Sequence, residues 1–171
     1  SNPEAIYRLP AFSMFSINQS AVALGLAQTT YNTYIKDARN RKTQSSGKTI
    51  ADFSTAQVKI AEVKTAISIA RMLLHECCNI GMQYAEQNAV TPIETKTELR
   101  AKAAMGGKLA AESVDLLFQL SGGAGLYDTN QISKAMRDMN CMRNHITQNW
   151  DVNASNYGRI LLGLSSADPA I

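Results

Sequence analysis

Residues 54–74 read STAQVKIAEVKTAISIARMLL, and this stretch decides the fold class. Its apolar or small residues recur at alternating steps of four and three: Ala56, Ile60, Val63, Ile67, Ala70 and Leu74. Such spacing places them on one narrow seam of an α-helix that packs against other helices. We expect Asp52 or Ser54 to cap the start of this helix. We expect it to end before Thr91-Pro92, because proline does not continue a helix.

Helices are also predicted on either side of this segment. Residues 20–38 carry a stripe with helical spacing: Ala21, Leu24, Gln28, Tyr31, Ile35 and Ala38. Residues 94–120 carry another: Leu99, Ala103, Gly106, Ala110, Val114 and Leu117. Small residues crowd the middle of the latter helix: Ala103, Ala104, Gly106, Gly107, Ala110 and Ala111. A helical glycine costs about 1 kcal/mol, so close approach of another helix is the simplest compensation.

A fourth helical region is expected over residues 128–150. One break is expected in it, because Met136, Met139 and Met142 share no clean stripe with Ile146. A short last helix is expected over residues 156–164. Alternating β-branched stretches with hairpin turns are almost absent from the sequence. The prediction is therefore an all-α fold, an antiparallel four-helix bundle.

Composition places the chain among folded, water-soluble proteins of one domain. Its 171 residues are 45% hydrophobic and 18% charged. No apolar run reaches the roughly 20 residues of a membrane helix, and no signal peptide is visible, so we expect a cytoplasmic protein without a membrane partner. Three cysteines, Cys77, Cys78 and Cys141, lack metal-binding spacing. They are expected to be reduced, buried thiols, with no metal site.

The positive charge is local. Net charge is only +3, yet five basic residues gather in one short segment: Lys36, Arg39, Arg41, Lys42 and Lys48. Either an anionic ligand or a solvated helix end would explain this cluster. Nucleic acid is disfavoured as a partner, because no aromatic residues alternate with the basic ones as stacking platforms.

Two histidines and one glycine-rich turn are candidate functional features. His75 lies within the helical segment, where a structural role is the commoner one, and for His145 the spacing alone leaves both structure and function open. The turn at residues 122–125 lacks the preceding strand of a dinucleotide-binding loop, so it is predicted to end a helix.

Several landmarks nevertheless occur together in a recognisable order. They are ARNRK at 38–42, IADF at 50–53, QVKIAE at 57–62, QLSGGAGLY at 119–127 and Arg137-Asp138. This series resembles the C-terminal helical-bundle domain (type 2) of the acyl-CoA dehydrogenase superfamily, across nearly all of residues 1–171. The resemblance implies a four-helix bundle that follows an N-terminal helical domain and a β-barrel domain, both absent from this chain. It also implies a homo-oligomer, a dimer or tetramer with flavin sites at subunit interfaces.

The resemblance also suggests cofactor-binding residues. Arg41 would meet flavin phosphate oxygens, with Arg39 as the second choice. Gln119, Gly122 and Gly123 would lie where backbone approaches the flavin of a neighbouring subunit. The basic loop is longer than the dehydrogenase pattern and lacks its phenylalanine, so FMN and FAD both remain open.

The position of acidic residues separates two branches of the superfamily. Dehydrogenases of this fold need a carboxylate base, yet no acid occurs between Glu4 and Asp37 or between Asp138 and Asp151. Instead His145 follows the Arg-Asp pair, as in oxygenase components of two-component flavin-dependent monooxygenases such as 4-hydroxyphenylacetate hydroxylase, which the ending at 156–164 also resembles.

This second resemblance implies a reaction. A flavin reductase would supply reduced flavin, oxygen would react with it, and one oxygen atom would pass to a small aromatic substrate. The catalytic residue would be His145, which would either activate a phenol or hydrogen-bond the flavin hydroperoxide.

Two alternatives remain open at this point. One is an acyl-CoA dehydrogenase-like oxidoreductase with its base elsewhere. The other is a non-catalytic helical oligomerisation module, whose small-residue and methionine-rich helices bury subunit contacts. In each case we expect the isolated chain to be inactive, because most of the flavin and substrate pocket would belong to other domains, and to self-associate through exposed apolar faces.

Overall fold

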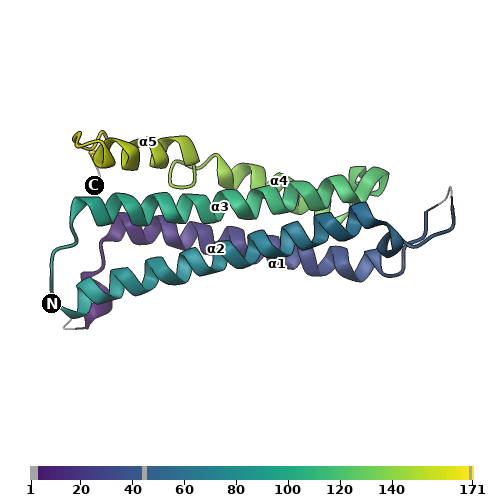
Figure 1. Ribbon diagram of the computed structural model, residues 1–171, viewed down its shortest axis with the longest axis horizontal. Coiled ribbons are helices and arrows are strands. Elements are labelled where there is room, and N and C mark those ends of the chain that lie inside the picture. The colour runs from purple at the N-terminus through teal and green to yellow at the C-terminus, as the bar shows by residue number, and fades with distance from the viewer. Residues whose placement is uncertain (1–3, 44–45, 170) are drawn as a thin grey trace.

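Three long helices form the body of the molecule, and two shorter helices lie along one side of it (Figure 1). The computed structural model describes residues 4–43, 46–169 and 171. The α-helices are α1 Ala11–Ala38, α2 Ser54–Glu86, α3 Ile93–Ser121, α4 Gln131–Arg143 and α5 Trp150–Leu161. Short 3-10 turns are η1 Ala5–Arg8, η2 Ile50–Asp52 and η3 Gly122–Leu126. The all-α prediction is confirmed, and none of the helices in the described ranges is long and apolar enough to cross a membrane.

The seam predicted on α2 is confirmed. Five of its six members are buried and the sixth is partly buried: Ala56, Val63, Ile67, Ala70, Leu74 and Ile60. The predicted cap is wrong, because Ser54 is already the first helical residue and Phe53 precedes it without a side-chain hydrogen bond. Asp52 is engaged elsewhere, pairing with Thr49 in a capping box around η2.

An asparagine ends α2 before the proline is reached. Asn88 has a φ of 53°, in the left-handed region. The amide of Ala89 donates to Tyr84 O at 3.0 Å, and the amide of Asn88 donates to Ala85 O at 3.2 Å. These two bonds form a Schellman motif and use carbonyls that the helix end leaves free. Pro92 then precedes the first residue of α3.

The predicted start of α1 is wrong by nine residues. The helix begins at Ala11, and its added turns bury Ser13 and Ser16, with Ile17 as their one buried large apolar side chain. A search for apolar periodicity cannot detect a helix face made of serines. The predicted stripe is also only partly right, since Leu24 is buried but Ala21 is exposed.

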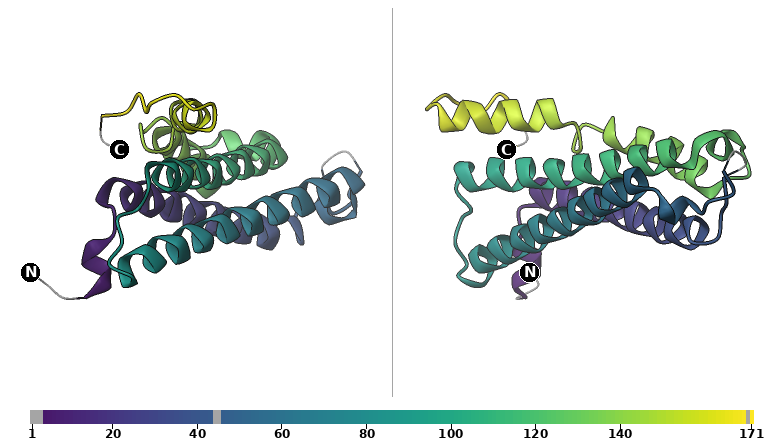
Figure 2. Two further views of the ribbon diagram at one scale, coloured as in Figure 1. Left: turned by 60° about the vertical axis from the view of Figure 1, so that its left-hand side comes forward. Right: turned by 45° about the vertical axis from the view of Figure 1, so that its right-hand side comes forward.

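Helix α3 lies at the centre of the bundle and packs against all four other α-helices. Figures 1 and 2 show α4 and α5 on the side of α3 that faces away from α2. Every residue of the stripe predicted on α3 is buried. A Cβ added to Gly106 would lie 3.6 Å from Ala70 O, so α2 does approach this stretch closely. A Cβ added to Gly107 would instead collide with the side-chain oxygen of Gln148.

The fourth helical region is broken once, as predicted, but its bounds differ from the prediction. Helix α4 ends at Arg143 and α5 begins at Trp150, so the loop lies inside the range 128–150 expected to be helical. The last helix therefore starts six residues before the predicted Asn156. Asn149 ends the loop, because its side chain accepts a hydrogen bond from the Val152 amide at 3.2 Å and caps α5.

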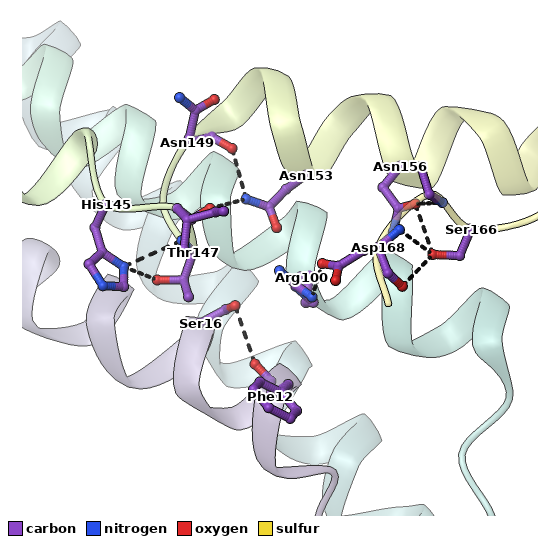
Figure 3. Close-up of polar contacts among 12 residues, drawn as sticks. Phe12, Ser16, Arg100, His145, Thr147, Asn149, Asn153, Asn156, Ser166 and Asp168 are labelled. Atoms are coloured by element: carbon purple, nitrogen blue, oxygen red, sulfur yellow. Dashed lines mark hydrogen bonds and ion pairs between the residues drawn. The ribbon is translucent and has the colours of Figure 1, made fainter. Parts of the chain in front are cut away.

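The chain after α5 folds back onto the bundle (Figure 3). Asn156 Oδ1 accepts hydrogen bonds from the Ala167 amide at 2.9 Å and from the Ser166 hydroxyl at 3.0 Å. Asp168 then forms a 2.7 Å ion pair with the buried Arg100 of α3. This pairing offsets the cost of burying the guanidinium charge and fixes the tail beside α5.

The three cysteines are free, as predicted, but only one is buried. Cys77 has no exposed surface, whereas Cys78 and Cys141 are exposed, so the prediction of burial is wrong for these two. Adjacent residues on a helix point about 100° apart, which is why Cys77 faces the core and Cys78 does not. Burial raises the pKa of the Cys77 thiol to about 12.

Substituting the two neighbouring glycines of α3 tests how tightly this helix is packed. Gly107→Ala should lower the free energy of unfolding by about 1–2 kcal/mol, because Gln148 must move and lose buried hydrogen bonds. Gly106→Ala is the matched control and should be neutral or stabilising by up to about 1 kcal/mol, since the added methyl makes ordinary contacts. Urea unfolding followed by circular dichroism measures both, and equal effects of the two substitutions would contradict this packing.

Thiol labelling tests the placement of the cysteines. In the native protein, Cys78 and Cys141 should react rapidly with Ellman's reagent, and Cys77 should react only after denaturation, because its thiol is buried and protonated. Cys77→Ala should remove only the thiol that reacts after denaturation and should leave the two rapid reactions unchanged. Rapid reaction of all three thiols in the folded protein would contradict the structure.

Candidate functional site

His145 lies in the loop between α4 and α5, two residues after the last helical residue Arg143. Its amide donates to Met142 O at 3.1 Å, and its carbonyl accepts from the amides of Gln148 at 2.8 Å and Asn149 at 2.9 Å. These bonds form a tight turn. His145 therefore lies at the break of the helical region predicted over residues 128–150, in a hydrogen-bonded turn.

The imidazole of His145 is exposed but makes defined contacts. Its Nδ1 lies 2.9 Å from the hydroxyl oxygen of Thr147, and the Thr147 amide donates to the same Nδ1 at 3.4 Å (Figure 3). The ring of Phe15 on α1 lies 6.0 Å away, centroid to centroid, at 54°. Nδ1 is thus turned toward the loop backbone, which leaves Nε2 as the nitrogen available to a ligand.

Gln148 anchors this loop in the bundle. Its side chain is buried, and its Nε2 donates to Ser16 O of α1 at 2.9 Å. Its Oε1 lies 2.8 Å from Ser20 Oγ, which also lies 2.6 Å from Ala103 O of α3. One amide therefore joins the loop to α1 and, through the serine, to α3, occupying the space that Gly107 leaves open.

The basic residue that was the first choice for cofactor binding is already engaged within the chain. Arg41 Nη1 donates to Ser121 O at 3.1 Å, and Nη2 donates to Leu120 O at 3.2 Å, where α3 ends. Its Nε lies 3.4 Å from an Asp37 carboxylate oxygen. A cation next to the last carbonyls of a helix satisfies them and interacts favourably with the helix dipole. The clearest role of Arg41 is to cap α3.

The remaining predicted cofactor residues gather at the same end of the bundle. Arg39 is exposed, and its side chain makes no hydrogen bond or ion pair with any described residue. Gln119, Gly122 and Gly123 are exposed as well, beside the helix end that Arg41 caps. A Cβ added to either glycine would meet nothing within 4 Å. Gly122 has a φ of 57° and stops α3, as predicted, whereas nothing within the described chain requires a glycine at 123.

The structure does not bring His145 together with this group of predicted cofactor residues. Phe15 contacts His145 near the start of α1, whereas Arg39 directly follows its last residue, Ala38. At about 1.5 Å per residue, Phe15 and Ala38 lie about 35 Å apart along the helix. Within one chain the two groups therefore lie at separate places along α1.

Two other candidates have simpler surroundings. His75 is exposed on α2 and, with Arg71 and Cys78, lines a surface hollow of about 330 Å³ between α1 and α2. The Arg137 guanidinium bonds Ser133 at 2.9 Å and Asp128 at 3.4 Å instead of the adjacent Asp138. Among the described residues no group of histidine, cysteine and acidic side chains could hold a metal ion.

Sequence reasoning missed the residues that hold His145 in place. Thr147 and Gln148 are two and three positions after the histidine, in a segment expected to be helical. Ser16 and Ser20 lay outside or at the edge of the predicted first helix. The available signal was serine spacing, since Ser13, Ser16 and Ser20 recur at steps of three and four and mark a polar helix face.

Comparison with known proteins gives a consistent family assignment. Residues 17–150 match the family model described as "Acyl-CoA dehydrogenase, C-terminal domain". The chain is 27% identical to the oxygenase component of p-hydroxyphenylacetate 3-hydroxylase from Acinetobacter baumannii, over 97% of this chain and 39% of that protein. It is 24% identical to indole-3-acetate monooxygenase from Pseudomonas putida, over 94% of this chain and 41% of that protein. The chain thus spans about two fifths of the length of these relatives.

Solved structures share the fold. XiaF from a Streptomyces species, in complex with FADH2 and glycerol, superposes with a TM-score of 0.92 at 20% identity, over 98% of this chain and 43% of that one. Butyryl-CoA dehydrogenase from Megasphaera elsdenii superposes with a TM-score of 0.74 at 19% identity, over 88% of this chain and 37% of that one. At these identities the likeness concerns the fold alone.

Two neighbouring arginines offer a matched test of structural and ligand roles. Arg41→Gln should lower the free energy of unfolding of the flavin-free chain by about 2 kcal/mol, because charged hydrogen bonds to the end of α3 are lost. Arg39→Gln should change it by less than about 0.5 kcal/mol, because that side chain is exposed and unbonded within the described chain. Urea unfolding measures both. An equal loss for the two variants would contradict the capping role of Arg41.

Proposed function

The chain belongs to the family of acyl-CoA dehydrogenase C-terminal domains, and from this premise we propose that it is the C-terminal domain of a flavin-dependent monooxygenase, the oxygenase component of a two-component system. The observation that carries the proposal is His145, an exposed imidazole on a loop fixed by buried hydrogen bonds. No acid lies between Asp138 and Asp151, where a dehydrogenase base would be expected. The curated relatives that cover nearly all of the chain include oxygenases of aromatic acids.

The exposed residues at the Arg39 end have the chemistry to hold a flavin. Arg39 offers a guanidinium with unused donors, suited to phosphate oxygens, and Gln119 offers an exposed amide. Gly122 and Gly123 present backbone with open space above it. Arg41 contributes by fixing the end of α3 beneath them. We therefore prefer Arg39 to Arg41 as the residue that binds the flavin phosphate, and we propose reduced FMN or FAD as the cofactor.

The proposed reaction divides between cofactor and protein. Reduced flavin, when bound, supplies the electrons that activate oxygen for transfer to a small aromatic substrate. His145 Nε2 would face the reacting atoms and hold or move a proton there. Phe15, exposed beside the imidazole, would pack against the substrate or flavin and help exclude water.

A complete site needs more than one copy of the chain. About 35 Å along α1 separates the His145 end from the Arg39 end, which supports a model in which the two groups serve different flavins, or one flavin shared by two subunits. We propose a homo-oligomer, a dimer or tetramer, in which one subunit's Arg39 end meets the flavin that lies at another subunit's His145. Exposed apolar residues near both ends supply contact surface: Phe12, Phe15, Leu126, Tyr127, Leu161 and Leu162.

The rest of the proposed system lies outside this chain. The complete enzyme would carry a helical domain and a β-barrel domain before these residues, and a separate reductase would supply the reduced flavin. The free thiols of Cys77, Cys78 and Cys141 suit a reducing compartment, so we place the enzyme in the cytoplasm.

Rapid-mixing experiments on the full-length protein test this function. The complex with chemically reduced flavin is mixed with oxygen and a phenolic substrate, and hydroxylated product and hydrogen peroxide are quantified. The wild type should convert most of the consumed oxygen into product. His145→Ala should lower product yield about 100-fold, with the lost oxygen appearing as peroxide, because a group acting in the transition state is lost.

The second histidine provides the matched control. His75→Ala should leave the product yield unchanged, since His75 lies on α2 in a different part of the surface. The contrary outcome is a wild-type protein that oxidises flavin without forming hydroxylated product, and that oxidises an acyl-CoA with a dye as electron acceptor. The monooxygenase proposal would then be wrong, and the dehydrogenase hypothesis would replace it.

A further inference from the structure

The hydrogen bonds at His145 decide which of two proton roles its imidazole can take. This inference rests on the proposed function and concerns the same site. A neutral imidazole carries one proton, on either Nδ1 or Nε2, and the nitrogen without the proton can only accept a hydrogen bond. The partner at one ring nitrogen therefore fixes the chemistry available at the other.

The decisive partner is a backbone amide. The Thr147 N–H points at His145 Nδ1, with a nitrogen-to-nitrogen distance of 3.4 Å. An amide can only donate, so Nδ1 must accept, and the neutral ring must carry its proton on Nε2. The Thr147 hydroxyl, 2.9 Å from the same Nδ1, reinforces this state by donating as well. Because Thr147 is buried, water competes poorly for either donor.

The surroundings keep the ring in this orientation. Rotation of the imidazole by 180° would replace Nδ1 with a carbon opposite both Thr147 donors. The Phe15 ring on α1 flanks the imidazole at 6.0 Å. Gln148, the residue after Thr147, ties the loop backbone to Ser16 O, so the amide donor cannot easily move away. The contacts thus come from the loop itself and from α1.

We propose that Thr147 is a positioning residue that holds neutral His145 in the Nε2–H form, so that His145 serves the monooxygenase as a hydrogen-bond donor and not as a proton-abstracting base. The ring nitrogen facing the ligand already carries a proton in this form. It can donate to an oxygen atom that gains negative charge in the transition state, where a fixed donor is most effective. A phenolic proton would have to go to another acceptor.

Nitrogen NMR tests the tautomer directly, because the chain contains only two histidines. In ¹⁵N-histidine-labelled protein in alkaline buffer, long-range proton–nitrogen correlations identify which ring nitrogen carries the proton. His145 should show one form, with Nδ1 as the bare acceptor. The exposed His75, which has no side-chain hydrogen bond to a described residue, should show a mixture of both forms and serves as the internal reference.

Three threonine variants separate the hydroxyl from general packing. Thr147→Val removes the hydroxyl contact at 2.9 Å but keeps the longer amide hydrogen bond at 3.4 Å, so it should shift His145 part of the way toward the mixture seen at His75, whereas Thr147→Ser should restore the single form. Thr30→Val is the matched control, because it removes another buried hydroxyl, bonded to Leu26 O at 2.8 Å on α1, and should leave the His145 signals unchanged. A proton on Nδ1 of wild-type His145 would overturn the proposal.

Kinetics of the full-length enzyme test the donor role. His145→Gln places an amide N–H near the position of Nε2. Its product yield should be at least about tenfold higher than that of His145→Ala, for which a loss of roughly 100-fold is expected. A base could not be replaced in this way, so equal losses for Gln and Ala would overturn the donor role. Product formation by the wild type tests the proposed function separately, and the NMR result does not depend on it.

Discussion

The absence of a side chain at Gly107 is the constraint on which the position of the candidate site depends. Because no Cβ occupies this point of α3, the Gln148 amide can enter the bundle and bond to α1. The loop between α4 and α5 is thereby fixed, and His145 with it. A few buried hydrogen bonds hold an exposed imidazole in a defined orientation, which is the usual requirement of a preorganised site.

The two ends of the bundle carry different groups of side chains. At one end Arg41 closes α3 by bonding its last carbonyls, and this leaves Arg39 and the exposed glycines as a surface open to an anionic group. The loop of His145 lies far along α1 from that surface. We therefore propose that the two groups meet only between copies of the chain, so that assembly would complete the site.

Much of the fold could be predicted because apolar periodicity reports packing directly. The seams of α2 and α3 are buried as expected, and the break after α4 followed from the mismatch between the methionines and Ile146. The start of α1 escaped prediction because its first turns bury serines. The capping of α2 escaped because Asp52 is bonded to Thr49 in the preceding turn.

The site was less predictable than the fold. His145 could be proposed from its place after the Arg-Asp pair, but its partners could not, because hydrogen bonds from Thr147 and Gln148 depend on a turn whose geometry no periodic pattern encodes. The role of Arg41 was similarly hidden, since the end of α3 lies about 80 residues away in the chain. Contacts distant in sequence need the folded chain to be seen.

The most direct measurement is the structure of the full-length protein with reduced flavin, prepared without oxygen. We expect a flavin ring within hydrogen-bonding reach of one subunit's His145 Nε2, with the phosphate of that flavin beside Arg39 of another subunit. A flavin held far from every His145, with the imidazole facing open solvent in the assembled protein, would contradict it.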